Sequence, residues 1–156
     1  MAKILVKSNV IFLDIDGVLN TVRTRSHPPL EPACIDVLNK IISLTNSKIV
    51  ISSNWRTILT MGELTKLLSE NNFVGEIIGY TEVYMSAKFS DYSCQRAKEI
   101  LNWLRRNKKK VDKYLILDDN DLGKGEELLI NNFIKTDRYV GLEDNHIDIA
   151  TKILGV

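Results

Sequence analysis

The sequence predicts an α/β fold, a three-layer α/β sandwich in which helices cover both faces of a mostly parallel sheet. Two observations lead to this prediction. Short apolar runs alternate along the chain with longer amphipathic ones, in an order close to βαβαβαβαβα. Three of the short runs end directly in a polar residue, at Asp14, Ser52 and Asp118, and ligands bind at the carboxyl ends of parallel strands.

The first two elements follow from an apolar run and a proline. Residues 10–13 are continuously apolar up to Asp14, which predicts a buried strand. Gly17 then begins a loop. Pro32 suits the first turn of a helix, and it is followed at helical spacing by Ile35, Leu38, Ile41 and Ile42.

The remaining elements are predicted from the same patterns. The expected strands are residues 48–51, 77–78, 114–117 and 133–134. The expected helices carry the apolar sets Leu64, Leu67 and Leu68; then Ala97, Ile100, Leu101 and Leu104, with Ser93 as the cap; and finally Ile147, Ala150, Ile153 and Leu154.

Length and composition indicate one globular domain over residues 1–156. The net charge of +1 creates no general basic field that would recruit nucleic acid or a membrane. Cys34 and Cys94 lie far apart, without metal-type spacing, and are expected to be reduced thiols. We expect a cytoplasmic protein, because no run is apolar enough for a signal peptide or a membrane span.

The polar residues after the strands predict a metal site. If these strands are neighbours, four carboxylates, those of Asp14, Asp16, Asp118 and Asp119, meet beside Ser52. Like charges at such distances cannot all remain ionised without a cation. Oxygen ligands without histidine or cysteine favour Mg²⁺, which also suits a substrate phosphate.

The residues around Asp14 resemble a known family. The run FLDIDGVL at residues 12–19 resembles the first motif of the haloacid-dehalogenase-like (HAD) superfamily of phosphohydrolases, and the later motifs follow in the superfamily's order. The chain is more similar still to the small HAD domains associated with Swiss Army Knife RNA repair proteins. That similarity rests on IVISSNWR at 49–56, RAKEILNWL at 96–104, LDDND at 117–121 and KTD at 135–137 with Gly141-Leu142.

The resemblance implies a Rossmann-like sheet and a phosphatase mechanism. Asp14 would attack phosphorus to form an aspartyl-phosphate, and Asp16 would act as general acid and base. Ser52, or alternatively Ser53, would donate a hydrogen bond to a phosphoryl oxygen. The phosphate-binding cation would be Arg96, where the superfamily usually has lysine, with Lys98 and Lys88 as alternatives.

The resemblance also implies a Mg²⁺ cofactor. The ion would be held by Asp14, the backbone carbonyl of Asp16, and either Asp118 or Asp119.

The DDND run also resembles the start of a calcium loop. Leu122 and Leu129, however, stand where that loop needs oxygen ligands, so the calcium interpretation fails.

The chain is too short between its motifs to hold a large cap domain. A site without a cap is open to solvent and suits a phosphate carried by a large molecule. Its substrate-binding residues are expected to be Ser53, Asn54, Arg56 and Arg23, with Arg25 nearby. The first substrate prediction, from the RNA-repair resemblance, is a phosphorylated nucleic-acid or nucleotide end.

Two other classes of function remain as alternatives. One is a catalytically silent HAD-like module that binds Mg²⁺ or phosphate without turnover, although Asp16 is present. The other is a nucleotide-sugar transferase that uses the Asp14–Asp16 pair to hold a metal. Such a transferase would not require Ser52 and the second acidic pair at matching strand ends.

Overall fold

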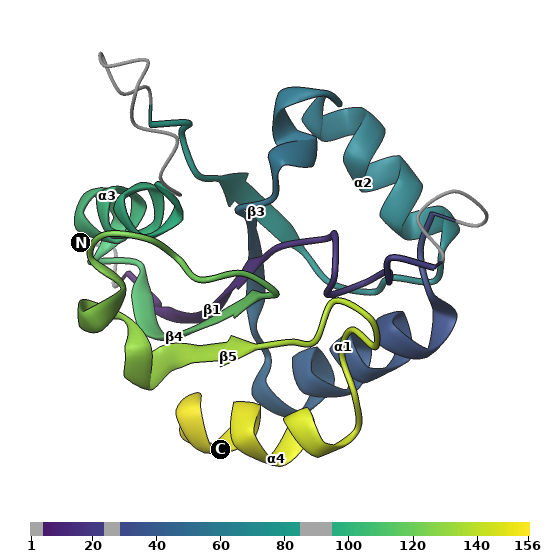
Figure 1. The fold of residues 1–156 in the computed structure, drawn as a ribbon. Coiled ribbons are helices and arrows are strands. Elements are labelled where there is room, and N and C mark those ends of the chain that lie inside the picture. Colours follow the sequence, from purple (N-terminus) through teal and green to yellow (C-terminus); the bar gives the residue numbers. More distant parts are fainter. Residues whose placement is uncertain (1–4, 24–28, 85–94) are drawn as a thin grey trace.

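A parallel five-stranded sheet forms the centre of the described structure (Figure 1). The computed structural model describes residues 5–23, 29–84 and 95–156. The strands lie in the order β3-β2-β1-β4-β5, and all four pairings between them are parallel. Their bounds are β1 Ser8–Leu13, β2 Lys48–Ile51, β3 Ile77–Tyr80, β4 Val111–Asp118 and β5 Phe133–Lys135.

Helices cover both faces of this sheet, which confirms the three-layer prediction (Figure 1). Their bounds are α1 Pro32–Thr45, α2 Met61–Glu70, α3 Arg96–Asn107 and α4 Asn145–Ile153. Pro32 occupies the first turn of α1, as expected. A capping box formed by Thr60 and Glu63 begins α2.

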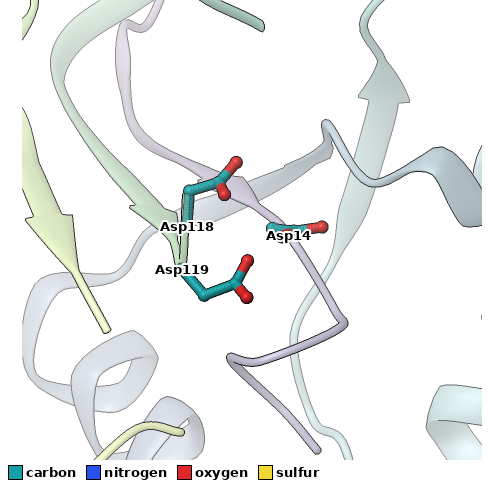
Figure 2. Close-up of side chains that lie close together, drawn as sticks. All are labelled: Asp14, Asp118 and Asp119. Carbon is teal, nitrogen blue, oxygen red and sulfur yellow. The ribbon is translucent and has the colours of Figure 1, made fainter. Parts of the chain in front are cut away.

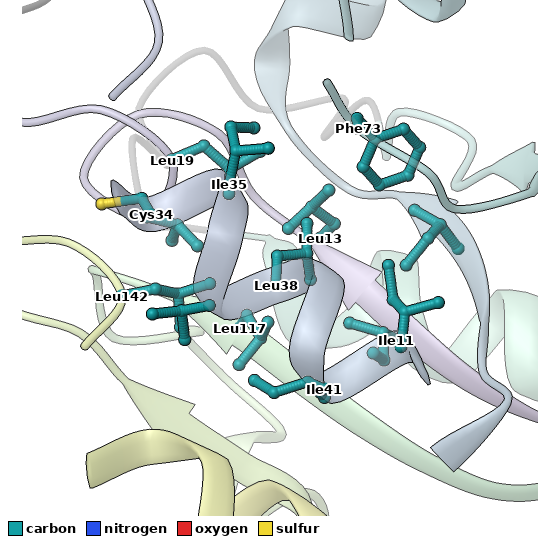
Figure 3. Packing of buried hydrophobic residues seen from close by; sticks show 14 of the residues in the cluster. Ile11, Leu13, Leu19, Cys34, Ile35, Leu38, Ile41, Phe73, Leu117 and Leu142 are labelled. Atoms are coloured by element: carbon teal, nitrogen blue, oxygen red, sulfur yellow. The ribbon is translucent and has the colours of Figure 1, made fainter. Parts of the chain in front are cut away.

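Alternation along the strands divides the apolar core in two. Ile11 and Leu13 of β1 face α1, α2 and α4, whereas Val10 and Phe12 face α3. Figure 3 shows the first of these cores, where Leu38 of α1 packs near Leu13. These four residues of β1 are all fully buried. This part of β1 is therefore covered on both sides, as expected of a central parallel strand.

The connection between β4 and β5 departs from the expected alternation. In place of a helix the chain forms two short 3₁₀ helices, Glu126–Leu128 and Ile130–Asn132. Leu122 and Leu129 from this connection are fully buried in the core on the α3 side, which agrees with rejecting a calcium loop. The apolar side chains of an irregular segment thus fill part of that layer.

Trp103 packs against the core and Cys34 lies within it, whereas the predicted cap of α3 lies outside the described residues. Trp103 of α3 packs edge-on against Phe12, with ring centroids 5.3 Å apart, and Cys34 is a buried free thiol. The residue before α3 is Gln95; the expected cap Ser93 lies outside the described residues, as does Cys94.

No cap domain interrupts the described chain. Among the described residues between Asp14 and β2, the helix α1 is the only regular element, and a short 3₁₀ helix, α2 and β3 follow Ser52. Within the described residues, no helix combines the length and the apolar character needed to cross a membrane.

Candidate active site

The strand order brings the predicted polar residues to one place. Strand β1 lies between β2 and β4, so the chain after Leu13 runs beside the ends of both neighbours. The Asp14 N–H donates to Leu117 of β4 at 3.0 Å, and the Ser52 N–H donates to Leu13 at 3.0 Å. The strand order reverses beside β1, which is where open α/β sheets bind ligands.

Three buried carboxylates form the centre of the site (Figure 2). Asp14, Asp118 and Asp119 each offer an oxygen, and these atoms all lie within 4.8 Å of one another. Burial raises the pKa of Asp14 well above its ordinary value, and the charge of Asp118 raises it further. Burial also raises the pKa of Asp118. Asp14 and Asp118 therefore resist ionising together, and a cation bound beside them would favour their ionised forms.

The donor set of this cluster fits Mg²⁺. Its ligand atoms are all carboxylate oxygens, and hard oxygen ligands are those that Mg²⁺ takes in proteins. The carboxylate of Asp16 does not belong to the cluster; its predicted metal contact is through the backbone carbonyl. Both Asp118 and Asp119 belong to it, so the structure keeps both as ligand candidates.

Arg96 is the buried cation beside Asp14 and Asp118. It is the first residue of α3, its side chain is 10% exposed, and Nη1 lies 3.0 Å from Asp118 Oδ2 and 3.6 Å from Asp14 Oδ1. It lowers the pKa of Asp14 against the effect of burial. Lys98 instead lies over the Tyr84 ring, at 5.0 Å from its centroid, and Lys88 lies outside the described residues.

Asp16 is half-buried and oriented by Asn20. The Asn20 amide donates to Asp16 Oδ1 at 2.9 Å, and Asn20 Oδ1 accepts from the Gly17 N–H at 3.0 Å. Asn20 is fully buried. Sequence reasoning missed it, because an asparagine in a loop gives no signal of what it contacts.

Gly17 provides the room in which Asp119 lies. Its φ of +77° is in the left-handed region. A Cβ at this position would stand 2.3 Å from Asp119 Oδ2 and 2.7 Å from its Cβ. Glycine is therefore required here both by the turn and by the close approach of the carboxylate.

The two serines after β2 differ in their surroundings. Ser52 Oγ is buried and has no hydrogen-bond partner among the described residues. Ser53 lines the cleft beside Asn54, and its Oγ accepts from the Trp55 N–H at 3.2 Å. Ser52 thus carries a buried hydroxyl without a hydrogen-bond partner among the described residues, whereas Ser53, also buried, lines the cleft.

Arg56, a predicted substrate-binding residue, is buried among backbone carbonyls and does not line the cleft beside Asp14. Its side chain is only 2% exposed, and its guanidinium donates to the carbonyls of Ser52, Ser53 and Thr81 at 2.7–2.8 Å. It also pairs with Glu99 at 2.6 Å. The donors that were expected to bind a phosphate hold the loop after β2 in place.

Glu99 joins both arginines of the site, and sequence reasoning missed this role. Its carboxylate is 7% exposed, lies 3.8 Å from Arg96 Nε, and accepts from the Tyr84 N–H at 3.0 Å as well as from Arg56. A helical glutamate three residues after Arg96 is a faint signal, because the same spacing is common on solvated helix faces.

A cleft of about 250 Å³ opens beside Asp14. It contains Asp14, Asp16, Asp119, Ser53, Asn54 and Arg96 from the prediction. Asn120 and Arg138 also line it, and sequence reasoning named neither. Arg23 is exposed and is not a lining residue; Arg25 lies outside the described residues.

A comparison with known proteins agrees with this geometry. Residues 10–147 match a family model described as the HAD domain in Swiss Army Knife RNA repair proteins. No match was found among curated proteins. The matched region contains β1 from Val10 onward, all of β2 to β5, and every lining residue of the cleft. With nine-tenths of the chain matched and the acidic site at the carboxyl ends of β1 and β4, the chain belongs to the family of HAD domains found in Swiss Army Knife RNA repair proteins.

Proposed function

We propose that this chain is a Mg²⁺-dependent phosphatase that hydrolyses a phosphomonoester through an aspartyl-phosphate on Asp14. The observation that carries the proposal is the surroundings of Asp14. Its carboxylate stands at the end of the central strand, 3.6 Å from the Arg96 guanidinium, and within 4.8 Å of the Asp118 and Asp119 oxygens. A nucleophile, an anion-binding cation and a metal-type cluster thus meet in one small cleft.

The first step transfers the phosphoryl group to the protein. An oxygen of the Asp14 carboxylate forms a bond to phosphorus while the bond from phosphorus to the leaving oxygen breaks. Asp16, entering protonated and oriented by Asn20, gives its proton to that leaving oxygen. Arg96 balances charge on the phosphoryl oxygens, and the unsatisfied Ser52 hydroxyl, or that of Ser53, donates to one of them.

The second step releases phosphate. The Asp16 carboxylate takes a proton from a water whose oxygen forms a bond to phosphorus, and the bond between phosphorus and Asp14 breaks. Inorganic phosphate leaves, and Asp14 and Asp16 return to their starting protonation states.

Asp14, the backbone carbonyl of Asp16, and Asp118 or Asp119 would hold the Mg²⁺ ion. When bound, it would neutralise the buried carboxylates and stabilise charge on the phosphoryl group. This assignment is supported by the oxygen-only donor set and by the raised pKa values of Asp14 and Asp118.

The proposed substrate is a phosphorylated nucleic-acid or nucleotide end. Support comes from the absence of a cap domain over the cleft in the described chain and from the family's association with RNA repair. A terminal phosphate on a long chain can enter such a cleft while the rest of the molecule stays in solvent.

Phosphate release tests the proposal. The substrates are p-nitrophenyl phosphate and oligonucleotides with a 3′- or a 5′-phosphate, each with Mg²⁺ or with EDTA. The wild type is compared with Asp14→Asn and with Asp112→Asn, an exposed residue near the opposite end of β4. We expect Mg²⁺-dependent release that Asp14→Asn abolishes and Asp112→Asn retains.

A silent binding module is the alternative that the same experiment tests. Absence of turnover on every phosphate, together with retained Mg²⁺ binding, would favour that module over the phosphatase.

A further inference from the structure

The size of the cleft limits how much of a substrate it can enclose. Its volume of about 250 Å³ is below the range of ~300–1,000 Å³ typical of small-molecule sites. The cleft can enclose a phosphoryl group and the atoms next to it, but it is smaller than the sites that enclose a whole small molecule. The next part of the substrate must lie across the rim, where the exposed lining residues determine what is bound.

Arg138 is the charged residue on this rim that sequence reasoning did not identify. Its side chain is 47% exposed, in contrast to the buried Arg96 on the same cleft. Its Nε lies 3.7 Å from Asp119 Oδ2, and Nη2 donates to Asn120 Oδ1. These two contacts direct the guanidinium along the rim toward the acidic cluster.

The backbone around Arg138 is held from both sides. The Arg138 carbonyl accepts from the Val22 N–H at 3.1 Å, which ties it to the loop that follows Asp16. Before it, Thr136 Oγ1 donates to the Gly17 carbonyl at 2.7 Å. After it, the Gly141 N–H closes a turn onto the Asp137 carbonyl at 2.7 Å, and the Leu142 N–H donates to Val18 at 2.9 Å.

These hydrogen bonds fix the backbone of Arg138, while its side chain remains partly exposed to solvent. The two buried arginines of the site differ from Arg138 in their contacts. Arg56 donates to backbone carbonyls, and Arg96 lies beside Asp14 and Asp118. A guanidinium on a preorganised loop suits bidentate recognition of a phosphate.

We propose that Arg138, oriented by Asn120, forms a second anion subsite that binds a phosphate group next to the phosphoryl group being hydrolysed. The inference rests on the proposed function, and it narrows the substrate to phosphomonoesters that carry a neighbouring phosphate. That neighbour is either an internucleotide diester or a second terminal phosphate, and both present the same anionic oxygens.

The test compares ligands that lack a neighbouring phosphate or carry it as a second terminal phosphate or as a diester to a further nucleoside. They are a 5′-mononucleotide, the matching nucleoside 3′,5′-bisphosphate, and a 5′-phosphorylated dinucleotide. For each, kcat/KM is measured with Mg²⁺ for the wild type, Arg138→Gln and Arg138→Lys, with Arg105→Gln as an exposed arginine control on α3. Equilibrium binding of the same ligands is measured in an Asp14→Asn background, with and without Arg138→Gln, by calorimetry.

We expect the wild type to prefer a ligand with a neighbouring phosphate over the mononucleotide. Arg138→Gln should reduce this preference roughly tenfold to a hundredfold, the loss expected for one charge-assisted hydrogen bond. Arg138→Lys should keep part of it, and Arg105→Gln should keep all of it. A preference for the dinucleotide identifies the diester as the neighbour, and a preference for the bisphosphate identifies a second terminal phosphate.

Two results separate this inference from the proposed function. Turnover with equal losses on all three ligands in Arg138→Gln, or with none, overturns the subsite and leaves the phosphatase standing. Absence of turnover on these ligands, on p-nitrophenyl phosphate and on both the 3′- and the 5′-phosphorylated oligonucleotides, with Arg138-dependent preference in the binding measurement, overturns the phosphatase and supports the subsite.

Discussion

Three acidic residues of the site are buried close to one another, an arrangement that Arg96 balances in part and that a bound cation would balance further. Asp14, Asp118 and Asp119 are each at most 6% exposed, and their oxygens lie within 4.8 Å of one another. Arg96 is the buried cation at 3.0–3.6 Å from two of them. Clusters of this kind mark functional sites, because a merely structural role would not require the burial of like charges.

Gly17 gives a prediction about the space beside Asp119. Gly17→Ala adds a Cβ that would overlap the Asp119 carboxylate, at a φ of +77° that costs an alanine about 1–2 kcal/mol. We expect the proposed phosphatase activity to fall roughly a hundredfold, the effect of moving a group of the site by about 1 Å. Steady-state kinetics and thermal unfolding measure the two effects.

Gly62→Ala is the matched control for this substitution. The nearest atom to a Cβ at Gly62 is 3.9 Å away, and the residue lies in the first turn of α2. Its stability should stay within about 1 kcal/mol of the wild type. Equal effects of the two substitutions would argue against the close approach of Asp119 to Gly17.

Glu99 gives a prediction about the positioning of the two buried arginines. Glu99→Gln removes the charge that Arg56 contacts at 2.6 Å and Arg96 at 3.8 Å. Removing one partner of a buried ion pair costs about 3–5 kcal/mol. We expect kcat/KM to fall roughly tenfold to a hundredfold at temperatures where the variant is still folded, because Arg96 and the loop after β2 lose their common support.

The control for Glu99 is an exposed ion pair on the same side of the sheet. Glu82→Gln breaks the pair with Arg106, whose side chains are 64% and 56% exposed. Such surface pairs contribute ~0–1 kcal/mol, so activity and stability should change little. If Glu99→Gln behaves like Glu82→Gln, the network does not position the site.

At the scale of elements, the connection between β4 and β5 covers part of the sheet where the expected alternation would place a helix. It contains two 3₁₀ turns and covers part of the α3 side of the sheet through Leu122 and Leu129. This connection begins at Asp119, directly after β4. Because Asp119 and Asn120 line the cleft, the packing of the connection supports one wall of it.

Two adjacent leucines in this connection should respond very differently to truncation. Leu129 is fully buried and Leu128 is 69% exposed. Leu129→Ala should lower the free energy of unfolding by about 2–5 kcal/mol, because it leaves a cavity in the core. Leu128→Ala should stay within about 0.5 kcal/mol of the wild type. Urea denaturation of both variants measures this difference, and similar midpoints would contradict the packing.

At the scale of the whole molecule, the acidic site makes stability depend on pH and on metal. Burial raises the pKa values of Asp14 and Asp118, so the metal-free folded chain holds protons more tightly than the unfolded chain does. Its stability should therefore fall as pH rises from about 4, the ordinary pKa of a carboxylate, through the raised values. Mg²⁺ binds the ionised form and should reverse this trend.

Thermal unfolding at pH 5 and pH 8, with EDTA or with Mg²⁺, tests this prediction. At a concentration one hundred times its Kd, Mg²⁺ adds ~2.7 kcal/mol, which raises the Tm of a chain of this size by roughly 5–10 °C. We expect that increase at pH 8 and a smaller one at pH 5. Asp14→Asn should raise the Tm in EDTA at pH 8 and reduce the Mg²⁺ effect; a Mg²⁺ effect that is independent of both pH and Asp14 would contradict the site.

Most of the fold could be predicted because its signals are local. The apolar runs before Asp14 and Ser52 are the observed strands β1 and β2, and helical spacing after Pro32 defines α1. The segment after Asp118 could not be predicted in the same way. Its buried leucines have no regular period, and only their contacts with α3 show that they replace a helix.

The sequence by itself determined the strands, the helices and the acidic residues that end the strands, since each depends on neighbours along the chain. Only the tertiary structure decided which polar side chains meet there. In the folded chain, Arg56 donates hydrogen bonds to backbone carbonyls and Glu99 lies between two arginines. Arg138 lies at the rim of the cleft. The reason is physical: a local pattern specifies which face of an element is buried, whereas the partner of a buried polar group depends on strand order and on loops far apart in the chain.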